Sequence, residues 1–186
     1  MSDTRNIAVF ASGTGTTLQA LIDNQTEYGY HVALVVANRT CTALERAQTA
    51  HIPTLQSCDW TKIGHALTQH SIQLIVLAGF LAIIPEWICH KWEKRIINIH
   101  PSLLPKHGGK GMYGIRVQEA VLAAGDTVAG CTVHYVSAEV DGGHIIAQAT
   151  VEVLANDTPE TLSQRVQQEE KKLLPQTIEQ LLNNAK

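Results

Sequence analysis

Short apolar runs alternate with polar segments along the first hundred residues. Runs that are apolar at nearly every position are typical of strands in a parallel sheet covered by helices on both faces. They occur at 7–11, 32–37, 74–78 and 96–99. The segments at 16–24, 43–50 and 60–70 carry apolar residues at helical spacing. This alternation predicts βαβ units, with functional loops at the carboxyl ends of the strands.

The second half of the chain has a different pattern. A glycine-rich segment at 108–114 predicts a loop, and a helix is expected over 117–124. Strands are expected at 132–136 and 145–153, on either side of Asp141-Gly142-Gly143. Those turn residues favour a reversal of direction, and therefore strands added to the sheet in antiparallel orientation.

The last helix has a clear start signal in Asp157-Thr158-Pro159-Glu160, and Pro175 is expected to kink or divide it. With 186 residues, the chain fits one domain, 1–186, made of halves at about 1–100 and 101–186. The predicted fold class is α/β. It has a Rossmann-like mixed sheet, mostly parallel in the N-terminal half, with antiparallel strands added C-terminally and helices on both faces.

The composition of the chain limits which binding partners and which cellular location are expected. The net charge is −3 and 45% of residues are hydrophobic, so neither a nucleic acid nor an anionic membrane is expected as a partner. The longest apolar run, 74–84, is shorter than the ~20 residues that span a bilayer. The polar opening at 1–6 lacks the apolar region of a signal peptide, so a cytoplasmic location is expected.

The cysteines and histidines do not indicate a metal site. Four scattered cysteines without C-x-x-C spacing argue against zinc or a disulfide framework and favour buried thiols in a reducing compartment. The nine histidines form no compact ligand pattern, so no metal is expected. His134 is interpreted as a packed or exposed strand residue, and His107 and His144 stay without a role.

The segment Ser12-Gly13-Thr14-Gly15-Thr16-Thr17-Leu18 joins the first expected strand to the first helix. Glycines at such a turn let backbone N–H groups and a helix N-terminus approach an anion. The segment lacks the Lys-Ser/Thr of a Walker motif and the third glycine of a dinucleotide fingerprint, so a single phosphate fits best. An ordinary tight turn with hydroxyl caps is the alternative.

Asn98 lies in the expected strand 96–99 and His100 follows it directly. The two residues are two positions apart, so on an extended chain both side chains leave the same face. Pro101 then ends the strand. An amide and an imidazole held together fit proton transfer and carbonyl polarisation, whereas the alternative is a satisfied polar pair at a strand end. Asp141, from the later turn, is a candidate to pair with an imidazolium.

Two further segments, 77–85 and 165–170, are interpreted from their composition. In 77–85, a buried strand ends at Gly79 beside apolar residues, which can form either a wall for a flat heteroaromatic ring or plain core. In 165–170, the charged residues read as a solvated helix face.

Taken together, S-G-T-G-T-T-L, L-A-G-F-L, I-N-I-H-P-S-L-L-P and V-D-G-G resemble the phosphoribosylglycinamide formyltransferase (glycinamide ribonucleotide transformylase) family of folate-dependent formyltransferases. The resemblance runs nearly end to end. Relatives that act on methionyl-tRNA or deformylate folate usually carry an extra domain, for which this chain is expected to lack room. The resemblance implies formyl transfer from 10-formyltetrahydrofolate to the amine of glycinamide ribonucleotide in purine biosynthesis, by a monomer or homodimer without a metal.

The resemblance also implies roles for single residues. His100 would transfer protons, Asn98 would stabilise the oxyanion and Asp141 would pair with His100. The substrate phosphate would bind Gly15, Thr16 and Thr17, and Glu170 would bind the ribose hydroxyls. The folate site would comprise Leu81, Ala82, Ile83, Ile84, Asn98, Ala138, Glu139, Val140 and Asp141.

Three features depart from the family pattern. Thr17 stands where Asn is common, and the loop 106–114 looks longer than usual. Lys106 or Lys110 is therefore a candidate to screen the phosphate. No clear counterpart of the arginine at the folate glutamate tail lies between Gln56 and Lys62. The rival functions are a formyltetrahydrofolate hydrolase with the same three residues and a non-catalytic nucleotide-binding domain.

Overall fold

The computed structural model describes residues 5–184. The first four residues of the polar opening and residues 185–186 lie outside the described part. Its elements, in chain order, are β1 (Asn6–Ala11), α1 (Thr16–Asn24), β2 (His31–Ala37), α2 (Thr42–Thr49), β3 (Thr54–Gln56), α3 (Trp60–Gln69), β4 (Leu74–Leu77), α4 (Glu86–Lys91), β5 (Ile96–His100), α5 (Ile115–Ala123), β6 (Val128–Tyr135), β7 (Ile145–Glu152) and α6 (Pro159–Asn184).

The strands form a seven-stranded sheet in the order β3-β2-β1-β4-β5-β6-β7. The pairs β1–β2, β1–β4 and β2–β3 are parallel, whereas β6 and β7 are antiparallel. The predicted fold class is therefore confirmed: a Rossmann-like mixed sheet flanked by helices, with its antiparallel strands at the C-terminal end.

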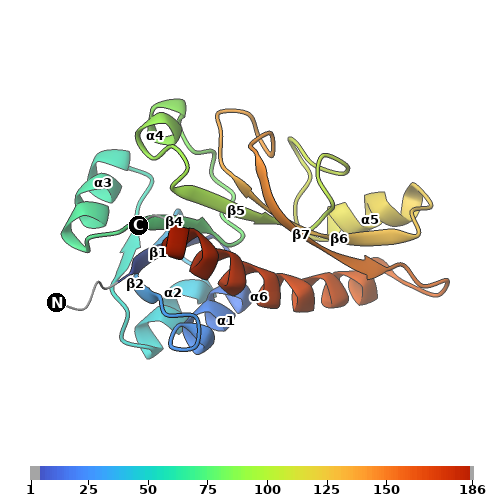
Figure 1. The fold of residues 1–186 in the computed structure, drawn as a ribbon, viewed down its shortest axis with the longest axis horizontal. Coiled ribbons are helices and arrows are strands. Elements are labelled where there is room, and N and C mark those ends of the chain that lie inside the picture. The colour runs from blue at the N-terminus through green and yellow to red at the C-terminus, as the bar shows by residue number, and fades with distance from the viewer. Residues whose placement is uncertain (1–4, 185–186) are drawn as a thin grey trace. The chain divides into compact units, whose positions relative to one another are not determined.

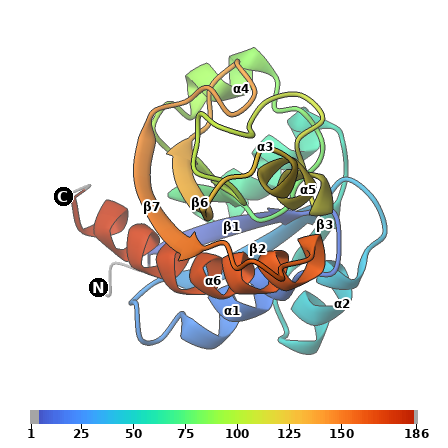
Figure 2. The ribbon, with the colours of Figure 1, turned by 90° about the vertical axis from the view of Figure 1, so that its right-hand side faces the viewer.

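Contacts within the chain define two compact units. The first contains residues 5–83, 95–97 and 178–184, and the second contains 84–94 and 98–177. In the first unit, α1 and α2 lie on one face of the parallel strands and α3 lies on the other (Figures 1 and 2). Every residue of β1 from Ile7 to Ala11 is buried, as expected for a central strand covered on both faces.

The second unit is built on the β6–β7 hairpin, which Figure 2 shows as a curved two-stranded ribbon. β6 is buried from Ala129 to His134, whereas β7 at the edge of the sheet is half-buried or exposed. α5 ends where predicted, because Gly125 has φ 68° and its N–H donates to the carbonyl of Leu122.

Three sequence expectations were wrong or incomplete. α6 runs unbroken through Pro175, because its neighbours Leu174 and Ile178 are fully buried and hold the helix despite the missing N–H donor. The short elements β3 and α4 were missed, since three and six residues carry too little periodicity. Of the cysteines, all free thiols, two are buried, Cys41 is half-buried and Cys58 is exposed.

Asp157 anchors the start of α6, as its cap signal predicted. Its carboxylate accepts hydrogen bonds from the Leu154 N–H and the Thr161 hydroxyl, each at 2.8 Å, and it forms an ion pair with Arg165. The hydrogen bond from the Arg165 guanidinium is the main reason that the pKa of Asp157 lies well below its ordinary value.

The first prediction follows from this clasp. A carboxyl with a lowered pKa stabilises the folded state above its unfolded pKa, and that contribution is lost as the pH falls through the folded pKa. Asp157→Asn should therefore reduce stability by about 1 kcal/mol near pH 7, and the difference from wild type should shrink below about pH 4. Thermal melts across this range test it, with Asp23→Asn on α1 as the control. A difference that is constant with pH would contradict it.

Candidate active site

The end of β5 presents the amide and the imidazole. His100 is 4% exposed and Asn98 is half-buried, and the strand ends before Pro101, as predicted. The ring of His100 faces two acceptors. Its Nε2 lies 3.0 Å from the backbone carbonyl of His107, and its Nδ1 lies 3.5 Å from Oδ2 of Asp141. Because a carbonyl oxygen can only accept, Nε2 carries a proton, and Nδ1 is the nitrogen that faces the carboxylate.

Asp141 reaches this ring from the connection between β6 and β7. Its backbone has φ 56°, and its Oδ2 accepts a hydrogen bond from the Gly109 N–H at 2.9 Å. Gly143 is needed for the tight reversal. A Cβ atom on Gly143 would lie 1.6 Å from the Tyr135 carbonyl oxygen, so a side chain there would push the two strands apart. The turn therefore holds the carboxylate beside His100.

His134 is a site residue that the sequence reading passed over. Its Nδ1 lies 2.9 Å from the Tyr135 carbonyl, so this nitrogen carries the proton. Burial lowers the pKa of His134 and favours the neutral ring, in which Nε2 is an acceptor. Nδ2 of Asn98 donates to this Nε2 at 3.1 Å. The amide orientation of Asn98 is thereby fixed, and its second N–H stays available for a carbonyl oxygen.

The glycine-rich turn in the first unit leads from β1 into α1. Gly15 is the N-cap with φ 71°, and the helix has no side-chain cap. A Cβ atom on Gly15 would lie 2.7 Å from Cα of Ala43 in α2, so only glycine fits. Thr16 and Thr17 open the helix and are half-buried. Backbone N–H groups of an uncapped helix start, with the positive end of the helix dipole, suit an anion.

Two arginines that the sequence reading missed fix this turn. Arg39 Nε donates to the Ser12 carbonyl and Arg46 Nε donates to the Thr14 carbonyl, each at 2.8 Å. The Ser12 hydroxyl donates to Asn38 at 2.7 Å and accepts from the Leu81 N–H at 2.9 Å. The turn is therefore rigid and has positive charge beside it. An arginine one helix away in sequence gave no local signal, because its contact depends on how α1 and α2 pack.

Glu170 lies on α6 in the second unit and is 7% exposed. Its environment corrects the reading of 165–170 as a solvated face, because this carboxyl faces the interior. Burial raises the pKa of Glu170 from its ordinary value of 4.5 to about 7, although Lys171 acts in the opposite direction. Burial, helped by the charge of Glu170, also raises the pKa of Cys131 to about 12, so that thiol is not a nucleophile near neutral pH.

The segments expected to bind folate are largely open. Leu81 and Ile83 are 48% and 71% exposed, Ala82 is half-buried, and Ile84, which belongs to the second unit, is buried. In the second unit, Ala138, Glu139 and Val140 are exposed and directly precede Asp141. Exposed apolar side chains that the fold leaves uncovered fit contact with a flat ring better than plain core packing does.

Among residues 5–184, no group of three or more His, Cys, Asp or Glu side chains is arranged to hold a metal ion. In the same part of the chain, no helix has the length and apolar character needed to cross a membrane. The described side chains offer a buried imidazole–carboxylate pair and an oriented amide, and the first helix begins at an anion-binding turn.

The family of the chain follows from its sequence and fold together. A model of the formyl transferase family matches residues 5–178, which include parts of both units. A crystal structure from Anaplasma phagocytophilum superposes with a TM-score of 0.91, covering 98% of this chain and 89% of that one at 36% identity. The chain belongs to the formyl transferase family.

The names of the relatives are more specific. The Anaplasma structure is named phosphoribosylglycinamide formyltransferase. An Arabidopsis thaliana protein named chloroplastic phosphoribosylglycinamide formyltransferase is 37% identical over 94% of this chain, which spans 64% of that relative. The trifunctional purine biosynthetic protein adenosine-3 of Bos taurus is 40% identical over 96% of this chain, which spans 18% of it. The chain thus spans less than two thirds of these curated relatives.

The second prediction concerns Glu170. Its raised pKa means that the unfolded chain loses this proton near pH 4.5 while the folded chain keeps it up to about pH 7. Stability is therefore lost as the pH rises through this window. Glu170→Gln should therefore be more stable than wild type by up to about 3 kcal/mol at pH 8, and should match wild type near pH 4. Thermal melts at both pH values test this, with the neighbouring Glu169→Gln as the matched control. A variant less stable than wild type at pH 8 would refute it.

Proposed function

We propose that the chain transfers the formyl group of 10-formyltetrahydrofolate to the amine of N1-(5-phosphoribosyl)glycinamide. The products are the N-formyl compound and tetrahydrofolate, in the de novo synthesis of IMP. The observation that supports this best is the buried His100–Asp141 pair beside the oriented amide of Asn98. The names of the relatives support the same activity.

The reaction requires an oxyanion to form and then collapse. The amine nitrogen attacks the formyl carbon, and the electron pair of the C=O bond moves onto oxygen. The free N–H of Asn98 and a protonated His100 stabilise that oxygen, the latter through Nδ1, which faces Asp141 without a short hydrogen bond. When the C=O bond re-forms, the bond from carbon to the folate nitrogen breaks. The amine loses a proton and the folate nitrogen gains one, with His100 as the carrier.

Substrate contacts are assigned to the segments already described. The phosphate is assigned to the backbone of Gly15–Thr17. The two ribose hydroxyls are assigned to Glu170, whose carboxylate would accept a hydrogen bond from each of them. The pterin is assigned to residues 81–84 and 138–141, with Asn98. The Lys106 ammonium pairs with Asp126, which disfavours the idea that it screens the phosphate.

The setting of the enzyme is also a proposal. We assign it to the cytoplasm, as a monomer or homodimer, with no partner beyond its two small-molecule substrates. Free thiols at all four cysteines support a reducing compartment, and one plant relative is named chloroplastic. The anion-binding turn belongs to the first unit, and Asn98, His100 and Asp141 belong to the second.

A single absorbance measurement separates the transferase from its rivals. Purified protein is mixed with 10-formyltetrahydrofolate, with and without glycinamide ribonucleotide. Loss of the formyl group that depends on the ribonucleotide supports the transferase. Loss without it indicates a hydrolase that uses water in place of the amine, and binding without any loss indicates a non-catalytic domain.

The third prediction tests the reactive groups. Asn98→Ala should reduce kcat about 10²–10³-fold, since it removes one oxyanion donor. His100→Ala should reduce it about 10²–10⁴-fold, since it removes acid–base help. Both variants should stay folded in thermal melts. His90→Ala, which removes an exposed histidine from α4, is the matched control. A His100→Ala variant with wild-type turnover would exclude the assignment.

The fourth prediction tests the anion-binding turn. Gly15→Ala places a Cβ atom against Ala43 in a left-handed backbone, which costs roughly 1–2 kcal/mol. The KM for glycinamide ribonucleotide should rise about tenfold, while the KM for the folate substrate stays near wild type. Gly13→Ala, whose Cβ would meet nothing within 4 Å, should have a smaller effect. Equal effects of the two variants would argue against a role of this turn in phosphate binding.

A further inference from the structure

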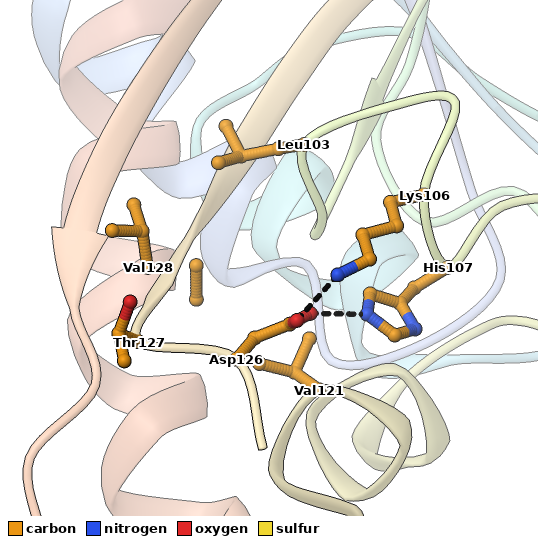
Figure 3. Close-up of a pocket in the computed structure, with 8 residues that line it drawn as sticks. Leu103, Lys106, His107, Val121, Asp126, Thr127 and Val128 are labelled. Carbon is orange, nitrogen blue, oxygen red and sulfur yellow. Dashed lines mark hydrogen bonds and ion pairs between the residues drawn. The ribbon is translucent and has the colours of Figure 1, made fainter. Parts of the chain in front are cut away.

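A charged cluster in the second unit takes no part in the mechanism above. Asp126 accepts hydrogen bonds from His107 Nε2, at 2.7 Å to Oδ2, and from Lys106 Nζ (Figure 3). It lies directly after the turn that ends α5, where its own N–H donates to the Val121 carbonyl. The carboxylate is therefore held on a fixed part of the fold.

Of the two contacts that Asp126 makes, the one with His107 is more shielded from solvent than the one with Lys106. The side chains of His107 and Asp126 are 13% and 15% exposed, whereas that of Lys106 is 65% exposed. Hydrogen bonds from Lys106 and His107 lower the pKa of Asp126, which keeps it ionised at neutral pH. An exposed ion pair contributes little, but a charge-assisted hydrogen bond between partly buried groups fixes geometry.

The backbone that follows this contact touches both members of the reactive pair. The His107 carbonyl accepts from His100 Nε2 at 3.0 Å, and the Gly109 N–H donates to Asp141 Oδ2 at 2.9 Å. Between them, a Cβ atom on Gly108 would lie 2.4 Å from Leu104 Cδ2 and 3.4 Å from Asp141 Cβ. Residues 107–109 are thus the surface against which the imidazole and the carboxylate are set.

Polar contacts hold the segment that carries Lys106 and His107, in addition to packing. A cavity of about 240 Å³ lies beside the cluster, with Leu103, Val121 and Val128 among its lining residues (Figure 3). Lys106, His107 and Asp126 line the same cavity. The segment has other polar anchors: the Ser102 hydroxyl contacts the Lys106 carbonyl at 2.6 Å and the His107 carbonyl at 3.4 Å, and the Lys106 N–H donates to the Leu103 carbonyl at 3.2 Å.

We propose that Asp126 is a positioning residue for the formyl transfer, acting through His107. Its hydrogen bond to the His107 ring sets the carbonyl that accepts from His100 Nε2, and so keeps Nδ1 directed at Asp141. This inference rests on the proposed function. Without the carbonyl in place, the imidazole loses the acceptor that selects its proton position. A misplacement of about 1 Å can cost on the order of 10²-fold in rate.

The test compares three variants of the whole chain in the transferase assay. Asp126→Asn keeps the size of the side chain but removes its charge, and it should lower kcat by 10-fold or more, up to about 10²-fold. The KM values of both substrates should stay within about twofold of wild type. Asp126→Glu should recover part of the lost kcat. Glu86→Gln, which removes the carboxylate of the exposed Glu86–His90 pair on α4, is the matched control and should match wild type.

A second readout does not depend on activity. In protein labelled with ¹⁵N-histidine, the ring signals of His100, assigned with His100→Gln, should show a proton on Nε2 in wild type. In Asp126→Asn that proton should exchange faster or shift. If Asp126→Asn does not fold, His107→Phe, which keeps a flat ring but donates nothing, should give the same loss of kcat.

The outcomes separate this inference from the function on which it rests. An inactive wild type would overturn the proposed function. Active wild type with unchanged kcat in Asp126→Asn would overturn the positioning role alone. A fall in kcat with a matching fall in melting temperature and an unchanged His100 ring signal would show a purely structural role, and would also overturn it.

Discussion

The structure depends most on the burial of an ionisable pair, His100 and Asp141. Removing an imidazole and a carboxylate from water is costly unless hydrogen bonds replace the lost solvent. Here the replacements come from backbone: the His107 carbonyl for the ring and the Gly109 N–H for the carboxylate. Backbone groups cannot swing away as side chains do, so the pair keeps its geometry before any substrate arrives. The strand end at Pro101 and the reversal at Asp141–Gly143 are both shaped to bring these partners together.

Much of the fold was predictable because its strands are buried on both faces. β1, β2, β4 and β5 appear in the sequence as runs that are apolar at most positions, and the starts of α1 and α6 have local signals. β3 and α4 were not predictable, because short elements are set by neighbours rather than by periodicity. The continuity of α6 through Pro175 has a similar cause. Burial of Leu174 and Ile178 outweighs a local helix-breaking signal, which no reading of the residues alone can weigh.

The residues of the candidate site also fall into those that the sequence could predict and those that it could not. Asn98 and His100 were identifiable because alternation along one strand places them on one face. His134, Arg46 and Asp126 were not, since their roles depend on contacts between segments distant in sequence. His134 orients Asn98 only because the β5 and β6 segments meet, and Asp126 reaches His107 across 19 positions of chain. Asp141 was a candidate from its turn, although only the structure brings it beside His100. Glu170 was named only through the resemblance to the formyltransferases, and the structure shows that its carboxyl is buried.

The raised pKa of the buried Glu170 carboxyl has a consequence for substrate binding. A buried carboxyl with a pKa near 7 is costly to ionise, so the empty protein carries unfavourable free energy at this point. On the proposed role, ribose hydroxyls would donate to the ionised form and recover that free energy. Substrate binding would then release a proton to the buffer, and the heat of binding would change with the ionisation enthalpy of the buffer. Below about pH 7 the carboxyl must lose its proton before it can accept from the hydroxyls, so the affinity for the ribonucleotide would rise with pH through this range.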